Sequence, residues 1–406
     1  MDALTTPSNW QRVRLGNIAE IIGGGTPSTQ VTSFWNGSIN WFTPTEIGIT
    51  KYVYKSQRTI TPLGLKKSSA KLLPIGTILL TSRASIGDCA ILKVVATTNQ
   101  GFQSLIPLEK INNEFLYYLM LTLKNKLLKL ASGSTFLEVS PNKIKNLLIP
   151  LPPLNEQIAI ANILSALDYY LYTLDALILK KESVKKALSF ELLSQRKRLK
   201  GFNQNWQRVR LGDIGITISG LAGKTKQDFI NGNAKYITFL NVLNNVIIDT
   251  SILENVKIYP NEKQNSFKKY DLFFNTSSET PKEVGMCAVL LDDIDQVFLN
   301  SFCFGFRIFD KAVDSLFLSY LINSEIGRKA FENLAQGSTR YNLSKSGFNN
   351  VCLILPPLNE QIAIANILSA LDHEIISLKN KKRQFENIKK ALNHDLMSAK
   401  IRVLKK

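Results

Sequence analysis

The chain has few of the residues on which metal sites and acid–base catalysis usually depend. Only two histidines, His373 and His394, occur among its 406 residues. The four cysteines form no CxxC pair, and each stands among apolar neighbours: Cys89, Cys287, Cys303 and Cys352. The sequence therefore favours buried free thiols over a metal site or a disulfide framework. It also favours a solvated helix face for both histidines.

The sequence motifs of several common enzyme classes are also missing. The chain has no GxxxxGK[ST] phosphate loop, no GxGxxG opening a βαβ unit, no HExxH and no GxSxG. Residues 23–29 (GGGTPST) are glycine-rich, but they lack the lysine and the strand-to-helix context of a phosphate loop. We interpret them as a turn that could approach a phosphate backbone. Scattered carboxylates have no defined partner (Glu46, Asp88, Glu279, Asp292). We predict no catalytic residue, no metal site and no cofactor.

Long hydrophobic runs are absent as well. No apolar stretch approaches the length needed to span a bilayer, and the first residues (MDALTTPSNWQRVRLG) lack a signal-peptide core. We therefore expect a soluble cytoplasmic protein. Its formal net charge of +18 favours a polyanionic partner, either nucleic acid or an anionic membrane surface.

The chain does contain an exact internal repeat. Residues 151–168 (LPPLNEQIAIANILSALD) recur at 355–372, 204 positions later (355 minus 151). Residues 9–16 (NWQRVRLG) recur at 205–212, 196 positions later (205 minus 9). The chain is therefore a tandem duplication, and its second copy carries about eight more residues between the two landmarks.

Each copy of the longer repeat predicts the start of a long helix. Pro152 and Pro153 disfavour helix before them, and Asn155 is a suitable N-cap. Apolar residues then recur in steps of three and four, which is typical of a helix that packs on another helix: Leu164, Leu167, Leu171, Leu174 and Ile178, and Leu368, Leu371, Ile375, Leu378 and Phe385. Residues 155–200 and 359–406 contain no proline or glycine. We therefore expect two helices of roughly 40 residues, about 60 Å long, packed on each other.

The segments before these helices predict mixed α/β domains. In the first, we expect strands at 18–22, 39–42, 76–81, 89–95, 101–106 and 144–149, and a helix at 114–130 capped by Asn113. In the second, we expect strands at 270–274, 287–291 and 301–309, and a helix at 315–334. Residues 133–135 (GST) recur at 337–339, but otherwise the two segments differ. We infer that the helices share one task while the domains perform two different tasks of one kind. Recent sequence exchange between the copies is an alternative origin of the identity.

Nucleic-acid binding is the function that charge and loop position favour. Lysine and arginine in loops can neutralise phosphates, and arginine can also read guanine. The candidate DNA-binding residues in or beside predicted loops are Thr26, Ser28, Lys66, Lys67, Arg83, Ser85, Ser134, Lys143, Lys224, Ser278, Lys282, Ser338, Arg340, Tyr341 and Lys345. For any one of them, a solvated surface side chain is the competing interpretation.

Taken together, these features resemble the specificity subunits of type I restriction-modification enzymes. The family's conserved opening, LPPLxEQxxIxxxLxxxD, matches both copies of the long repeat. Residues 24–28 (GGTPS), 82–91 (SRASIGDCAI) and 99–105 (NQGFQSL) are also similar to this family. In the second copy, the similar stretches are 271–285 and 299–307. The resemblance covers essentially the whole chain.

The resemblance implies an α+β, pseudo-twofold tandem repeat. Two mixed α/β target recognition domains (1–150 and 201–354) would alternate with long helices (151–200 and 355–406) that pair antiparallel, like a coiled coil. Each domain would read one half of a bipartite, asymmetric site on double-stranded DNA, and the helices would set the gap. The helices would also dock two modification (methylase) subunits, which bind S-adenosylmethionine, and restriction subunits would then join.

In this interpretation the chain is not itself an enzyme. The residues that we expect to contribute to docking lie in the two helix openings: Glu156, Gln157, Ile160, Glu360, Gln361 and Ile364. The alternatives are an orphan sequence-specific DNA-binding protein without a methylase, an enzyme in its own right, or a helical scaffold. The lack of an NPP[YF] motif argues against the enzyme.

Overall fold

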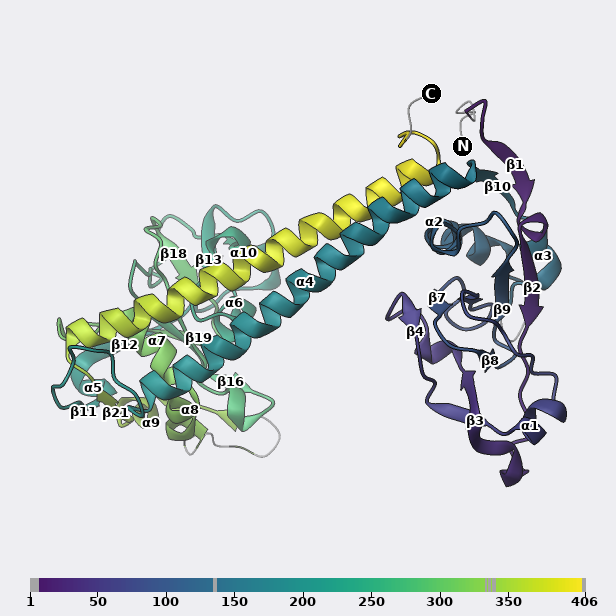
Figure 1. Ribbon diagram of the computed structural model, residues 1–406. Helices are drawn as coiled ribbons and strands as arrows, with labels where there is room; N and C mark the ends of the chain where they lie inside the picture. Colours follow the sequence, from purple (N-terminus) through teal and green to yellow (C-terminus); the bar gives the residue numbers. More distant parts are fainter. Residues whose placement is uncertain (1–6, 134–136, 333, 335–336, 338–340, 404–406) are drawn as a thin grey trace. The chain divides into compact units, whose positions relative to one another are not determined.

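The computed structural model describes residues 7–332 except 134–136, together with residues 334, 337 and 341–403 (Figure 1). The chain divides into two compact units. Unit 1 contains residues 1–176 and 380–406, and unit 2 contains residues 177–379. Both boundaries fall inside a long helix. Each unit therefore contains one mixed α/β domain, the first half of one long helix and the last half of the other.

The two long helices have the predicted length. Helices α4 (Leu154–Leu193) and α10 (Leu358–Met397) each contain 40 residues and are unbroken in Figure 1. Within each unit the two helix halves run antiparallel. Lys389 pairs with Asp168 and Lys382 with Asp175 in unit 1. The predicted N-cap was wrong, because α4 begins one residue before Asn155. The Pro153 carbonyl accepts the first helical N–H groups instead.

The described part of the domain of unit 1 forms three sheets. A five-stranded sheet has the order β2-β9-β6-β7-β4, a three-stranded sheet has the order β5-β3-β8, and β1 pairs with β10. The strands are β1 (Gln11–Arg14), β2 (Ala19–Gly23), β3 (Trp35–Phe42), β4 (Tyr52–Val53), β5 (Arg58–Ile60), β6 (Ile78–Leu80), β7 (Cys89–Leu92), β8 (Ala96–Thr98), β9 (Gln103–Pro107) and β10 (Leu148–Leu151). The helices are α1 (Pro62–Lys66), α2 (Asn113–Leu130) and α3 (Pro141–Lys145).

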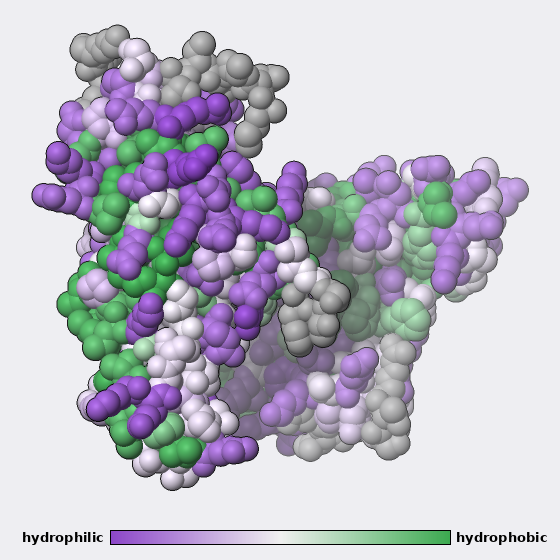
Figure 2. Space-filling view, turned by 90° about the vertical axis from the view of Figure 1, so that its right-hand side faces the viewer, coloured by the Kyte–Doolittle hydropathy of each residue, from purple (hydrophilic) through white to green (hydrophobic). Residues whose placement is uncertain are grey.

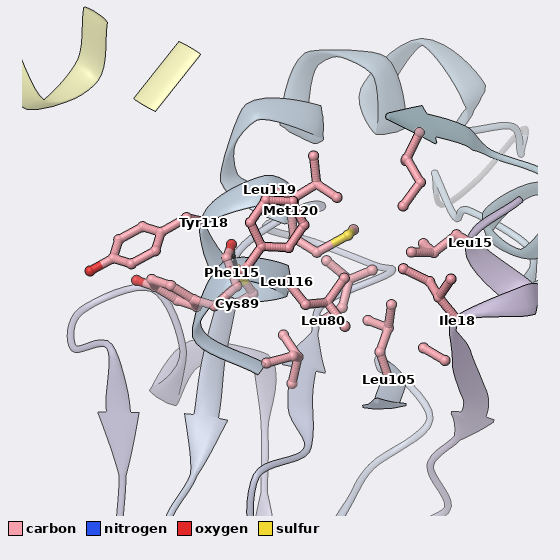
Figure 3. Packing of buried hydrophobic residues seen from close by; sticks show 14 of the residues in the cluster. Leu15, Ile18, Leu80, Cys89, Leu105, Phe115, Leu116, Tyr118, Leu119 and Met120 are labelled. Carbon is pink, nitrogen blue, oxygen red and sulfur yellow. Dashed lines mark hydrogen bonds between the residues drawn. The ribbon is translucent and has the colours of Figure 1, made fainter. Parts of the chain in front are cut away.

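Helix α2 closes the larger sheet of unit 1. Its N-cap is Asn112 rather than the predicted Asn113, and the Asn112 side chain accepts from the Phe115 N–H at 2.8 Å. Phe115, Leu116 and Leu119 of α2 lie in the same hydrophobic cluster as Leu80 of β6 and Cys89 of β7 (Figure 3). The same core contains Leu164 from α4 and Leu396 from α10. Residues of both long helices are therefore part of the hydrophobic core of this unit.

Unit 2 repeats this plan with different side chains. Its sheets have the orders β12-β19-β15-β17 and β14-β13-β18, with two further pairs, β11-β21 and β16-β20. The strands are β11 (Gln207–Arg210), β12 (Gly215–Ser219), β13 (Ala234–Ile237), β14 (Glu254–Val256), β15 (Leu272–Asn275), β16 (Ser277–Ser278), β17 (Cys287–Val289), β18 (Val297–Leu299), β19 (Cys303–Ile308), β20 (Tyr341–Asn342) and β21 (Cys352–Leu355). The helices are α5 (Leu211–Ile214), α6 (Phe239–Asn244), α7 (Ser315–Asn323), α8 (Glu325–Glu332) and α9 (Lys345–Asn349).

Two predicted elements differ in the structure. The helix expected at 315–334 is two helices, α7 and α8, divided at Ser324, whose hydroxyl accepts from the Gly327 N–H at 3.2 Å and so caps α8. The strand expected at 144–149 begins instead with α3, which the Ser140 side chain caps. In both cases a serine side chain starts a short helix that hydrophobic periodicity does not reveal.

The prediction that the four thiols are free is confirmed, but the prediction that they are buried is wrong for Cys352, which is partly exposed. All four cysteines are free, and Cys89, Cys287 and Cys303 are buried. Burial raises the pKa of the Cys89 thiol to about 12. Within the described ranges, no cluster of three or more histidine, cysteine, aspartate or glutamate residues could hold a metal ion. No helix in this part of the chain combines the length and apolarity that crossing a membrane requires.

Candidate nucleic-acid interface

Four segments of unit 1 meet in one surface, which we call loop cluster 1 (residues 23–29, 81–88, 99–102 and 137–143). Backbone hydrogen bonds join them in sequence. The Gly25 N–H donates to the Thr98 carbonyl at 2.8 Å. The Ser82 N–H donates to the Gly101 carbonyl at 2.8 Å, and the Val139 N–H donates to the Ser82 carbonyl at 3.1 Å. Loops that are far apart in the sequence thus lie side by side in the fold.

The glycines of loop cluster 1 are required by close backbone packing. A Cβ at Gly24 would lie 1.9 Å from the Asn99 carbonyl oxygen, and a Cβ at Gly25 would lie 2.3 Å from the Ala70 nitrogen. Residues 24–28 have no regular secondary structure, and the turn follows at 29–30. The turn predicted for residues 23–29 therefore lies only at the end of this segment.

The structure places the candidate DNA-binding residues of unit 1 in two groups. Thr26 and Ser28 lie in the glycine-rich segment, where the Thr26 hydroxyl donates to Gln100. Lys66 and Lys67, at the end of α1, are exposed. These four residues form the first group, and in the described part of the chain neither lysine is engaged in an ion pair that a ligand would have to break.

The second group of unit 1 is held more tightly by the protein. Arg83 pairs with Glu138 at 2.8 Å. The Lys143 ammonium donates to the Leu130 carbonyl at 2.9 Å. The Ser85 hydroxyl is buried and has no hydrogen-bond partner among the residues that the structure describes. Ser134 lies outside the described residues. This group first of all stabilises the loops themselves.

Unit 2 has an equivalent surface, loop cluster 2 (residues 220–224, 275–283, 299–303 and 341–345). The Leu221 N–H donates to the Leu299 carbonyl at 2.8 Å, which corresponds to the Gly25–Thr98 bond of unit 1. The Leu343 N–H donates to the Thr276 carbonyl at 2.8 Å, which corresponds to the Val139–Ser82 bond. The backbone plan of the loops is thus repeated although their sequences differ.

The candidate residues of loop cluster 2 differ in their availability. Lys282 is exposed, and Tyr341 lies opposite Ser278 in the β16–β20 pair. The Ser278 hydroxyl donates to Glu283 at 2.7 Å, and the Lys345 ammonium donates to the Ser219 hydroxyl at 2.7 Å. Ser338 and Arg340 lie outside the described residues.

The Lys224 ammonium is bound within the protein and is not exposed to a ligand. Only 5% of its side chain is exposed, and its ammonium binds Glu262 and donates to the Lys257 carbonyl at 2.6 Å. This ammonium holds the pKa of the Glu262 carboxyl below its usual value. The loop position of Lys224 therefore does not make it available to a phosphate unless the ion pair opens.

The six candidate docking residues are buried in their own units. Glu156 is 1% exposed and accepts from the Trp10 indole N–H at 3.1 Å and from the Arg402 Nε at 2.8 Å. Glu360 is 0% exposed and accepts from the Trp206 indole N–H at 3.2 Å and from the Arg198 Nε at 3.1 Å.

The neighbouring candidates are bound in the same way. The Gln157 side chain accepts from the Asn112 N–H at 3.0 Å, and that of Gln361 accepts from the Asp314 N–H at 2.9 Å. Ile160 and Ile364 lie in the hydrophobic cores. These contacts within the chain account for the repeated residues, and a docking role for them stays a prediction.

Sequence reasoning missed the residues that complete these contacts. Arg198 follows the end of α4, and Arg402 follows the end of α10. They lie 204 positions apart (402 minus 198), the same spacing as the repeat. Trp10 and Trp206 belong to the two copies of NWQRVRLG. That shared spacing was a signal that could have identified the arginines as equivalent.

The outer surface of unit 1 is mixed in character. Figure 2 shows hydrophilic side chains interleaved with hydrophobic ones on the face of the domain turned toward the viewer. On the long helices, large side chains remain exposed between the buried ones, among them Tyr169 and Tyr172, each 71% exposed, and Ile376, 54% exposed. A partner that binds the helices would meet these side chains first.

Comparison with known proteins gives a consistent result. Residues 7–181 and 203–387 each match the family described as type I restriction modification DNA specificity domain. The chain is 31% identical over 298 residues to the type I restriction enzyme MjaIX specificity subunit of Methanocaldococcus jannaschii, covering 68% of both chains. It is 27% identical to the MjaVIII specificity subunit of the same organism, covering 99% of this chain and 95% of the relative.

Solved structures share the fold. A type I restriction-modification system S subunit from M. genitalium superposes with a TM-score of 0.59 at 17% identity and covers 97% of both chains. The HsdS subunit from Thermoanaerobacter tengcongensis gives a TM-score of 0.54 at 18% identity and covers 99% of this chain and all of that one.

Proposed function

We propose a division of labour that starts from one premise: the chain belongs to the family of type I restriction modification DNA specificity subunits. It is thus the DNA specificity component of such an enzyme and does not itself catalyse a reaction. In our proposal, loop cluster 1 and the adjoining three-stranded sheet read one half of a bipartite, asymmetric DNA site. Loop cluster 2 and its sheet read the other half.

One observation carries this proposal. The two units share the backbone plan of their loops, but the side chains on those loops differ, whereas the buried contacts of the helix openings are the same in both. Sequence is read by side chains at base edges, while phosphate contacts fix position. Two equivalent loop surfaces with different side chains are what reading two different half-sites requires.

The long helices would set the distance between the half-sites. A 40-residue helix is about 60 Å long. Each end of α4 packs into a hydrophobic core, and we expect this packing to limit its bending. Half-sites about one turn apart, about 34 Å, require such a fixed separation. We further propose that the exposed faces of α4 and α10 dock two modification subunits, which supply S-adenosylmethionine-dependent methylation, and that restriction subunits join this assembly.

The first test is methylation mapping by long-read sequencing of DNA from cells that carry the chain with its cognate modification subunit. We expect methylated adenines in a two-part motif with a fixed gap. A continuous motif would contradict the division between the units. A chain that binds one DNA sequence tightly but never directs methylation would support an orphan DNA-binding protein, and a complex without sequence preference would support a scaffold.

Exchange of residues 1–150 for another recognition domain assigns the half-sites. We expect one half-site to change while the other half-site and the gap are retained. Insertion of one or two helical turns near residue 177 of α4, matched in α10, should change the gap and leave both half-sites unaltered. A domain exchange that altered both half-sites would disprove the modular arrangement.

A further inference from the structure

Arg58 of unit 1 has an unusual setting that charge alone does not predict. It lies on β5, directly opposite Trp41 of β3, which in turn lies opposite Thr97 of β8. The Arg58 guanidinium carbon is 3.8 Å from the centre of the Trp35 ring and 5.4 Å from that of Trp41. A guanidinium stacked on an aromatic face is held in one plane, so its orientation is largely fixed before any ligand binds.

The two tryptophans are themselves fixed by the glycine-rich segment. The Trp41 indole N–H donates to the Gly25 carbonyl at 2.8 Å, and the Trp35 indole N–H donates to the Ser28 carbonyl at 3.0 Å. The rings are 4% and 8% exposed and meet edge to face with centres 5.0 Å apart. The Trp35 and Trp41 rings form a platform under Arg58. The close packing of Gly24 and Gly25 therefore determines where this platform lies.

The guanidinium remains available to a ligand. Arg58 is exposed, and in the part of the chain that the structure describes no carboxylate forms an ion pair with it. Arg83 differs, because Glu138 already occupies its guanidinium. Stacking uses the face of the guanidinium and leaves its N–H edge free. A planar pair of donors matches the O6 and N7 acceptors of guanine in the major groove.

Unit 2 has the opposite charge at the same place. The rows Arg58–Trp41–Thr97 and Glu254–Tyr236–Phe298 occupy the same registers in sheets of the same order, β5-β3-β8 and β14-β13-β18. Glu254 accepts from the Tyr236 hydroxyl at 2.8 Å. In each unit an aromatic residue on the central strand thus orients a charged residue on the edge strand, but the charged residue differs.

We propose that Arg58 is a specificity-determining residue that reads a guanine base in the half-site bound by unit 1. This inference rests on the proposed function and deepens it. Two features favour a base over a phosphate. The position is fixed by stacked rings, as discrimination requires, and its charge differs between units that must both bind phosphate.

The experiment uses the full chain with its modification subunit and repeats the methylation mapping with Arg58→Gln and Arg58→Lys. The domain exchange described above identifies the half-site of unit 1. For the unaltered chain we expect a G·C pair in that half-site. In Arg58→Gln, preference for this pair should fall about tenfold to a hundredfold, while the other half-site and the gap are retained. Arg58→Lys keeps the charge but lacks the paired donors, so it should also lose selectivity.

Two matched controls separate base reading from phosphate binding. Lys67→Gln removes a neighbouring exposed cation, and we expect uniformly weaker binding to a pool of randomised 30-bp duplexes, with a salt slope smaller by about one and an unchanged motif. Glu254→Gln should leave the half-site of unit 1 unaltered. Circular dichroism and thermal melting verify that each variant is folded, and Arg58→Lys replaces Arg58→Gln if the latter is not.

Several outcomes would overturn the inference. One is a half-site of unit 1 that contains no G·C pair. Another is an Arg58→Gln or Arg58→Lys chain that binds all duplexes more weakly with the same motif, because that result identifies a phosphate contact. If the unaltered chain itself directs no two-part motif, the proposed function fails first, and the two failures are thereby distinguished.

Discussion

The openings of the two long helices and the edges of the two three-stranded sheets have diverged to very different degrees. At the helix openings, Glu156 and Glu360 each bind a tryptophan and an arginine in equivalent positions. At the sheet edges, equivalent positions carry Arg58 and Glu254. The buried carboxylates each depend on partners from two other segments of the chain, so a change at one residue requires changes at the others. In the described part of the chain, the exposed edge residues contact aromatic side chains of the neighbouring strand only, so a change at one of them requires fewer changes elsewhere.

The constraint extends along the helix pair. Asp168 accepts from the Tyr118 hydroxyl and pairs with Lys389, and Asp372 accepts from the Tyr320 hydroxyl and pairs with Lys185. Lys185 and Lys389 are 204 positions apart (389 minus 185), like the arginines. The beginning of each helix is therefore complementary to the end of the other, and this complementarity is repeated in both units. It gives a structural reason for the identity of the two copies.

The strongest test of this equivalence is to remove the buried carboxylates one at a time. Glu156→Ala leaves the Arg402 and Trp10 N–H groups without their acceptor. We expect a loss of about 3 kcal/mol from the stability of unit 1. This is at the lower end of the range for broken buried ion pairs, because Arg402 is partly exposed. Glu360→Ala should cause a similar loss in unit 2. Native-state hydrogen exchange resolves the two units. Glu374→Ala, which breaks an exposed pair with Lys181, is the control and should change little. Equal loss of protection in both units would show that they do not depend on separate contacts.

The glycine-rich segment offers a second test, of the loops rather than the helices. Gly24→Ala places a Cβ 1.9 Å from the Asn99 carbonyl oxygen, and the segment must shift, so we expect a loss of about 2 kcal/mol and weaker reading of the half-site of unit 1. Gly220→Ala, with a Cβ 2.3 Å from the Asn300 carbonyl oxygen, is the equivalent change in unit 2. Gly23→Ala meets nothing nearer than 3.7 Å and serves as the control. Thermal melting and duplex binding measure the two effects, and unimpaired binding by Gly24→Ala would show that the platform tolerates movement.

The sequence predicted those features whose pattern extends over many residues, and it missed those that a single side chain decides. The 40-residue helices followed from an uninterrupted apolar period, and the tandem repeat followed from identical letters. The division between α7 and α8 was missed because one serine hydroxyl creates it, within a continuous apolar pattern. Local patterns thus revealed the presence and length of elements better than their boundaries.

The candidate site was less predictable for a physical reason. Lys224 and Lys282 look alike in sequence, yet the first is buried beside Glu262 and the second is exposed. Arg58 was missed because its setting depends on two tryptophans on another strand and on carbonyls of the glycine-rich segment. Availability of a charge is decided by partners distant in the chain, which one sequence without its fold does not reveal.

The tyrosines that bind Asp168 and Asp372 allow a finer comparison of the units. Tyr320→Phe removes one hydroxyl that donates to Asp372 at 2.7 Å, and we expect a loss of about 1 kcal/mol. The Tyr118 hydroxyl also accepts from the Lys51 ammonium at 2.8 Å, so Tyr118→Phe should cost more, about 1.5 kcal/mol. Urea unfolding followed by tryptophan fluorescence measures both. Equal losses would mean that Lys51 adds nothing to the contact in unit 1.

The smallest effect that we predict is the dependence of stability on alkaline pH that Tyr320 of unit 2 causes. Burial, with the hydrogen bond to Asp372 as a further cause, raises the pKa of Tyr320 above its ordinary value of 10.0. The unfolded chain therefore loses this proton first, so the stability that Tyr320 contributes is complete below pH 10 and declines as the pH rises toward the folded-state pKa. At pH 10.5 the loss is about 0.8 kcal/mol for one tyrosine with an unfolded pKa of 10. Urea unfolding at pH 8 and pH 10.5 should show a pH dependence smaller by this amount in Tyr320→Phe than in the unaltered chain. An identical pH dependence in the two chains would mean that Tyr320 ionises as readily in the folded protein as in the unfolded one, and that its bond to Asp372 does not hold the proton.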